Sequence, residues 1–90
     1  MLRDTFQITT ASPGQLVQFN EWLANRHSAI VDFTACRYTD EDCFVPIFQA
    51  IRRSSQLTLI VREGTRWVDK CRVLGLDKAC EINVQRAVAG

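Results

Sequence analysis

The sequence is short of several residue types that catalysis and metal binding usually require. It has one histidine, four glycines and two prolines in 90 residues, and no glycine-rich loop that would hold a phosphate group. A single histidine excludes a metal site built on paired histidines, and no serine, histidine and acid arrangement indicates a nucleophilic enzyme. We therefore expect a non-catalytic protein with no metal site and no cofactor.

Long hydrophobic runs and an excess of one charge are also missing. The chain is 47% hydrophobic, but charges interrupt its apolar runs, and none approaches the ~20 residues that cross a bilayer. The formal net charge is +1, which favours neither nucleic acid nor an anionic membrane surface as a partner. We expect one cytoplasmic domain over 1–90, without direct membrane insertion.

The four cysteines match no redox or zinc motif. Cys36, Cys43, Cys71 and Cys80 show neither a CxxC pair nor paired zinc-knuckle spacing. We interpret them as small, mostly buried thiols in a reducing compartment. A redox-responsive or metal-responsive role through Cys36 and Cys43 is the weakest alternative, because the carboxylates beside Cys43 disfavour a thiolate.

Four segments have the pattern of β-strands. Residues 6–10 alternate and contain β-branched side chains, and 80–84 alternate like an edge strand. The runs 29–33 and 57–61 are nearly continuous in apolar residues, which is typical of central parallel strands that are covered on both faces. Two edge strands and two central strands predict a four-stranded sheet.

Helical patterns separate these strands. Residues 12–15 have a capping pattern, with proline at the first position of the predicted first helix. The segment 44–54 has one apolar side and should form the second helix. Its N-cap should lie near residue 42 or 43, so that Pro46 falls in the first turn. A third helix should begin near Thr65 and stop at Gly75. We interpret 76–79 as a turn.

The resulting order is β-α-β-α-β-α-β, which predicts an α/β fold with a mostly parallel four-stranded sheet and helices over it. The core should cover about 6–84, and 85–90 should form a flexible tail. Trp22 and Trp67 both fall in apolar helical stripes, so we expect both in the core, with Trp67 the more exposed of the two.

Charged chemistry is concentrated at Asp40, Glu41 and Asp42, between a predicted strand and a predicted helix. Carboxylates in the first turn of a helix interact favourably with its dipole, and that alone is a sufficient structural reason for them. The alternative is a surface that binds a partner protein. A divalent-metal site is less favoured, because a metal ion would need further oxygen ligands from another loop, and Asp32 is too buried in its predicted strand to supply one.

The order of elements and three sequence features resemble the STAS domain family, which includes bacterial anti-sigma-factor antagonists and the tails of sulfate transporters. The features are the run 29–33 followed by Asp40 at a strand-to-helix corner, the central strand 57–61, and the ending Val73 to Lys78, which contains a Gly-Leu pair. The resemblance covers roughly Phe6 to Val84. Many members have two strands before the first helix, whereas this chain has room for one.

The resemblance implies a regulatory role, with one marked departure. In switching members a serine or threonine at this corner is phosphorylated by a kinase-type partner, and the phosphate breaks the complex. Asp40 matches the corner aspartate, but Glu41 and Asp42 occupy the hydroxyl positions, and Cys43 stands where glycine is usual. Carboxylates cannot accept the phosphate and partly imitate it. This chain is then either held in a state like the phosphorylated one or has left the switch.

We therefore expect a bacterial, non-catalytic regulatory module of the anti-sigma-factor-antagonist type. The expected contact residues lie on the corner and on the helix that follows it, namely Asp40, Glu41, Asp42, Cys43, Gln49 and Arg52. The partner that the resemblance implies is a kinase-type anti-sigma factor or a membrane-transport complex.

A small anionic-ligand carrier or sensor is the alternative function. Arg62, Arg66 and Lys70 follow the third predicted strand, at the end of the sheet where parallel α/β proteins often bind ligands. Glu63 and Asp69 interleave with them, which is also the pattern of an ordinary solvated helix face and weakens any interaction with nucleic acid.

Overall fold

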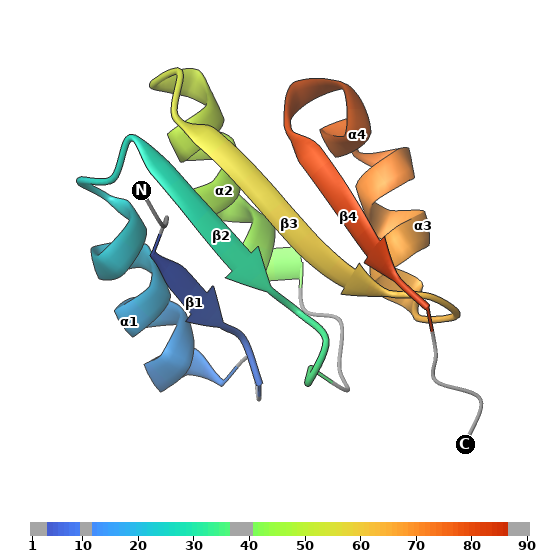
Figure 1. Cartoon of the computed structure of the whole chain (residues 1–90). Helices are drawn as coiled ribbons and strands as arrows, with labels where there is room; N and C mark the ends of the chain where they lie inside the picture. Colours follow the sequence, from blue (N-terminus) through green and yellow to red (C-terminus); the bar gives the residue numbers. More distant parts are fainter. Residues whose placement is uncertain (1–3, 10–11, 37–40, 87–90) are drawn as a thin grey trace.

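The computed structural model describes residues 4–9, 12–36 and 41–86, with only the backbone of Glu41. Strands and helices alternate along the chain, as Figure 1 shows. The helical elements are α1 (Pro13–Leu23), the 3-10 turn η1 (Glu41–Cys43), α2 (Phe44–Arg52), α3 (Arg66–Val73) and α4 (Leu76–Ala79). The strands are β1 (Thr5–Gln7), β2 (Ser28–Asp32), β3 (Gln56–Arg62) and β4 (Glu81–Gln85).

The four strands form one parallel sheet in the order of the sequence, β1-β2-β3-β4. Its register aligns a row of apolar side chains across all four strands, namely Phe6, Val31, Leu59 and Ile82. The predicted α/β fold with a four-stranded parallel sheet is confirmed. β1 ends at Gln7, earlier than predicted, and of the predicted tail the structure describes only Gln85, the last residue of β4, and Arg86.

All the helices lie on one face of the sheet (Figure 1). Each neighbouring strand pair is joined by a crossover, and right-handed crossovers that advance in one direction place every helix on the same side. Val31 and Leu59 are fully buried beneath the helices, whereas Ile30 and Ile60 on the other face are partly exposed. The prediction that both faces of the central strands are covered is therefore wrong.

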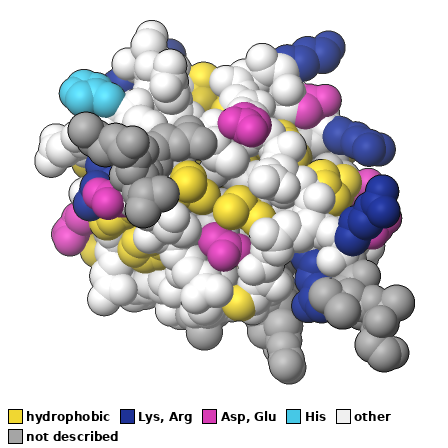
Figure 2. All heavy atoms as spheres, in the orientation of Figure 1, with side chains coloured by type: hydrophobic (Ala, Val, Ile, Leu, Met, Phe, Trp, Pro, Cys, Tyr) yellow, Lys and Arg dark blue, Asp and Glu magenta, His cyan; other side chains and the backbone are white. Residues whose placement is uncertain are grey.

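The face opposite the described helices, which we call the open face, contains apolar and polar side chains side by side. Figure 2 views it in the orientation of Figure 1 and shows separate hydrophobic side chains among polar and charged ones. Thr58 is 5% exposed there, because its neighbours in the sheet cover it and its hydroxyl donates to Glu81 Oε2 at 3.2 Å. Neighbouring side chains, rather than a second helix layer, thus shield the centre of this face.

Local sequence chemistry positions the helix starts as predicted. Ser12 caps α1 by accepting a hydrogen bond from Gln15 N at 3.4 Å, and Pro13 is the first helical residue. The Gln15 side chain ties this cap to the preceding strand, since its Oε1 accepts from Thr9 N at 3.0 Å. Pro46 lies in the first turn of α2, whose N-cap is Cys43, so the proline removes no helical hydrogen bond.

The third helix ends as its glycine predicts. Gly75 has φ 74°, the left-handed conformation that glycine adopts without strain, and α3 ends two residues before it. The segment 76–79 forms the one-turn helix α4 rather than a turn, because its first residue, Leu76, is fully buried and anchors it to the core. No helix in the described ranges is long and apolar enough to cross a membrane.

The relative exposure of the two tryptophans is the opposite of the prediction, which had Trp67 as the more exposed. Trp67 is 1% exposed and its ring lies 4.3 Å from that of Phe33, whereas Trp22 is only partly buried. Trp22 packs on Phe6 beside the short strand β1, and the Arg26 guanidinium covers its ring at 4.3 Å. A tryptophan at the margin of the helix layer thus stays partly open, while one at its centre is enclosed.

Candidate functional site

The acidic corner lies where β2 ends and α2 begins. Asp32 closes β2, and its Oδ1 accepts hydrogen bonds from Thr34 N at 2.8 Å and Thr34 Oγ1 at 2.7 Å. Asp40 lies outside the described residues, and Glu41 opens the turn η1. Asp42 has an exposed side chain one residue before the N-cap of α2. The structure thus places one of the three carboxylates at the surface.

Three buried aromatic rings pack together next to the end of β2 and the start of α2. Phe33 follows β2, Phe44 opens α2 and Trp67 belongs to α3, and all three are at most 2% exposed. The ring centroid of Trp67 lies 4.3 Å from that of Phe33 and 5.3 Å from that of Phe44. Packing of this kind adds ~0.5 to 1.5 kcal/mol per pair beyond the buried area, so Phe33 after β2 and Phe44 at the start of α2 are firmly held.

Cys43 belongs to the core and not to a contact surface. We expected it among the contact residues, but its side chain is 0% exposed, beside the equally buried Phe44. The η1 turn rotates residue 43 inward at the point where residue 42 faces solvent. A partner would therefore meet Asp42 and not the thiol.

The outer side of α2 carries a stripe of exposed side chains that continues from Asp42. Val45 is 52% exposed, and Gln49 and Arg52 follow at helical spacing and are also exposed. The opposite side of the helix is buried through Phe44, Pro46, Ile47 and Ala50. We call the exposed set Asp42, Val45, Gln49 and Arg52 the α2 stripe.

Sequence reasoning identified Gln49 and Arg52 but missed Val45. The signal was present, because Val45 falls outside the spacing of the buried positions Phe44 and Ile47 on the same helix. A valine on the solvent side of an amphipathic helix is a common exception and carries little weight alone. Its place beside the acidic corner is what makes it informative.

The basic residues of the alternative function lie around the turn after β3. Arg62 ends β3, and its carbonyl accepts hydrogen bonds from Thr65 N at 3.2 Å and Thr65 Oγ1 at 2.6 Å, which close the turn. Arg66 opens α3 with an exposed side chain, and Lys70 lies one turn later and is partly buried. The structure thus places them in sequence around one turn, and their use as an anion site stays a prediction.

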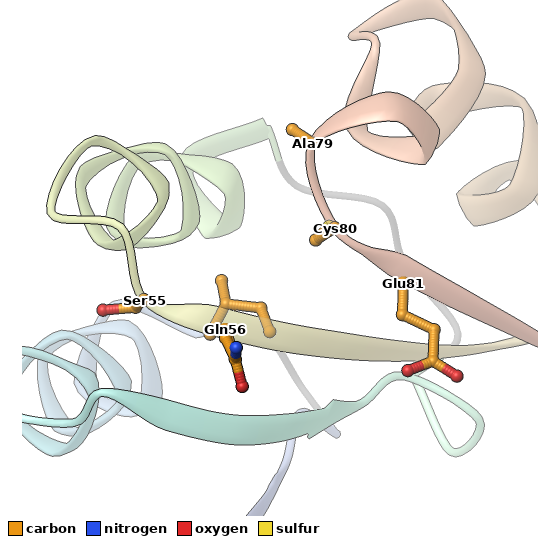
Figure 3. A pocket seen from close by; sticks show the side chains of 6 residues that line it. Ser55, Gln56, Ala79, Cys80 and Glu81 are labelled. Atoms are coloured by element: carbon orange, nitrogen blue, oxygen red, sulfur yellow. The ribbon is translucent and has the colours of Figure 1, made fainter.

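A cavity of about 300 Å³ lies at the opposite end of the sheet, where β3 and β4 begin (Figure 3). Its lining residues are Ser55, Gln56, Leu57, Ala79, Cys80 and Glu81. Ser55 Oγ already donates a hydrogen bond to Arg26 O at 2.9 Å, and Cys80 Sγ donates one to Leu76 O at 3.2 Å. Part of its polar lining is thus already hydrogen-bonded within the protein.

The thiols of Cys71 and Cys80 are poorly suited to redox chemistry near neutral pH. Burial, with smaller contributions from Cys80 and Asp77, raises the pKa of Cys71 to about 11. Burial and then Asp77 raise the pKa of Cys80 to about 11. Cys36 and Cys43 are buried, as the sequence predicts, and no cluster of ligands in the described part of the chain suits a metal ion. These thiols behave as core residues.

No protein-family model matches this sequence, and neither a curated protein nor a solved structure matches it significantly.

Proposed function

We propose that this protein is a non-catalytic regulatory module that binds a partner protein through the acidic corner 40–42 and the α2 stripe. The observation that supports this most directly is the position of Val45. It is 52% exposed on the outer side of α2, with the Asp42 carboxylate one turn before it and the Gln49 amide one turn after it. An apolar side chain between polar neighbours is the usual composition of a small protein contact.

The anchoring of α2 in the core favours this role. Phe44 and Ile47 anchor α2 in the core, and Phe33 anchors the end of the chain that enters the corner. Asp42 and Val45 are therefore presented on a surface that is already ordered before binding. Preorganised contact residues lose less conformational entropy on association, which favours affinity.

The charge pattern indicates the chemistry of the partner. Glu41 and Asp42 add fixed negative charge, and Arg52 closes the far end of the stripe with a positive charge. A complementary surface would have basic side chains opposite the corner, an apolar patch opposite Val45 and an acceptor opposite Arg52. The resemblance to the STAS family implies a kinase-type anti-sigma factor or a membrane-transport complex, and the cysteines, three of which are buried in the core, suit a reducing compartment such as the cytoplasm.

The test is a capture experiment from source-cell lysate with a reversed charge at the corner. Wild-type protein is compared with the double variant Glu41→Lys/Asp42→Lys. The control Glu21→Lys/Glu63→Lys makes the same change in net charge at two exposed positions away from the corner. We expect one protein to be recovered with wild type and with the control, and to be lost with the corner variant. Equal recovery on all three would refute the role of the corner.

A second arm tests the phosphorylation logic. The variant Glu41→Ser/Asp42→Ser restores hydroxyls at the corner, and the matched change Glu21→Ser/Glu63→Ser places hydroxyls elsewhere. If the carboxylates imitate a phosphate, the corner variant gains a kinase partner and becomes phosphorylated, which intact-mass spectrometry detects. A corner variant that binds nothing new and stays unmodified would separate this chain from the phospho-switch.

A further inference from the structure

The last strand of the sheet has an outer edge that no strand in the described part of the chain covers. β4 ends the strand order, and the carbonyl of Gln85 accepts a hydrogen bond from Glu63 N at 2.7 Å on the β3 side. Backbone groups of successive strand residues point alternately to the two sides. The N–H and C=O groups of Ile82 and Val84 therefore point outward, where they can pair with another strand.

The side chains of β4 alternate between the two faces of the sheet, and their pattern is symmetric about Asn83. Glu81, Asn83 and Gln85 lie on the open face, and Ile82 and Val84 lie on the helix face. α3 packs on β3 and α4 on the start of β4, so Val84 is left 45% exposed at the margin. From Glu81 to Gln85 the pattern is polar, apolar, polar, apolar, polar, which reads the same in both directions around Asn83.

We propose that two copies of this chain associate by pairing their β4 edges in antiparallel fashion around Asn83. In this register Ile82 lies opposite Val84 of the second copy, and the outward backbone groups of these two residues face each other. Each such pair exchanges two hydrogen bonds, and the two-fold axis generates two equivalent pairs of Ile82 with Val84. The apolar side chains meet on the helix face, and Glu81 meets the Gln85 amide of the second copy on the open face.

Neighbouring registers fit less well. A shift that centres the pairing on Val84 places Ile82 opposite Arg86 of the second copy, and a shift that centres it on Ile82 leaves Gln85 opposite Ala79. If the two-fold axis passed between two residues, backbone groups that point away from β3 in one copy would lie opposite groups that point toward β3 in the other. The hydrogen bonds between the copies would then be lost. The strand also has no lysine, proline or bulge between Glu81 and Gln85, the devices that usually prevent edge pairing.

The pairing would join two sheets into one eight-stranded sheet, and it leaves the α2 stripe free, because α2 packs beside α1 and lies behind β2 and β3, away from the outer edge of β4. The inference is thus independent of the proposed function. An edge contact of this kind is small, so we expect association in the micromolar range.

The first test is sedimentation velocity over about a hundredfold range of protein concentration. Val84→Pro removes an outward N–H and leaves the ladder to β3 intact, and Val84→Lys places a charge opposite Ile82. Val84→Thr keeps both the shape and the N–H as a control. Wild type and Val84→Thr should convert from monomer to dimer, and Val84→Pro should associate about thirtyfold more weakly. Far-ultraviolet circular dichroism checks that each variant is folded.

Two results would overturn the proposal. One is a wild-type protein that remains monomeric over the whole range. The other is a dimer that survives both Val84→Pro and Val84→Lys, because such a dimer must use another surface.

The second test determines the register. In a Cys80→Ser background, Asn83→Cys places two thiols directly opposite each other in a non-hydrogen-bonded pair, the geometry in which cross-strand disulfides form. Gln85→Cys is the control, since it is on the same face and is also exposed but lies opposite Glu81 of the second copy. Mild oxidation should yield a covalent dimer with Asn83→Cys only. Cross-linking through Gln85→Cys instead would refute the register.

Discussion

The ring centroids of Phe33 and Trp67 lie 4.3 Å apart, and the buried indole N–H of Trp67 has no hydrogen-bond partner among the described residues. Phe33 directly follows β2 and Trp67 belongs to α3, so this pair connects the end of β2 to the helix layer. The stability of the corner should therefore depend on the aromatic surface of Trp67 and not on its polar atom.

Replacing Trp67 with phenylalanine tests this relationship. A buried donor without a partner destabilises a fold, so its removal should offset part of the lost packing. We expect Trp67→Phe to cost less than ~1.5 kcal/mol, and Phe33→Ala to cost ~3 to 5 kcal/mol through the cavity that it leaves. Urea unfolding measures both. Equal losses would mean that the indole N–H has a partner.

Stability should fall as the pH rises from 9.0 to about 11. The folded-state pKa values of Cys71 and Cys80 are raised from 9.0 to about 11, so the folded protein holds these protons more tightly than the unfolded chain does. Their contribution is complete below pH 9.0 and is lost as the pH rises through about 11. Denaturant midpoints across this range should fall more steeply for wild type than for Cys71→Ala/Cys80→Ala. Parallel profiles would contradict the prediction.

The two glycines Gly75 and Gly14 should respond in opposite directions to alanine. Gly75 has φ 74°, and a side chain there is strained, so Gly75→Ala should cost ~1 to 2 kcal/mol. Gly14 lies in the first turn of α1, and a Cβ added there meets no atom within 4 Å. Gly14→Ala should stabilise by ~0.4 to 1 kcal/mol by restricting the unfolded chain. The measurement is the shift in denaturant midpoint.

Val45 should matter for binding and not for folding. The side chain is 52% exposed, so Val45→Lys should change the free energy of unfolding by less than ~0.5 kcal/mol. It should nevertheless abolish capture of the partner, because it places a charge in the apolar centre of the α2 stripe. Val17→Lys on α1, where valine is 59% exposed, is the matched control and should capture normally. Loss of capture with both variants would point to a general charge effect.

Local chemistry made much of the fold predictable. Ser12 and Pro13 set the start of α1, Pro46 limits where α2 can begin, and Gly75 ends α3, and each acts through its own backbone conformation or hydrogen bond. The periods of the apolar residues then distinguish strands from helices. These interactions extend over a few residues, so they can be read without the tertiary structure.

The candidate site was less predictable, since it depends on how deeply each residue lies. Asp42 and Cys43 are adjacent, yet one is exposed and the other is 0% exposed, because η1 turns the chain at that point. Periodicity also could not rank the two tryptophans, since it reports which side of a helix is apolar and not what packs against that side.

The sequence by itself determined the order of strands and helices, the helix boundaries that depend on single residues, and the concentration of carboxylates at 40–42. Only the tertiary structure decided that the described helices share one face, that Val45 lies exposed near Asp42, and that β4 is the last strand of the sheet within the described ranges. The physical reason is the separation in sequence over which the interactions act. Caps and turns act between neighbours in the chain, whereas burial depends on the direction in which successive crossovers stack and on side chains that are distant in sequence.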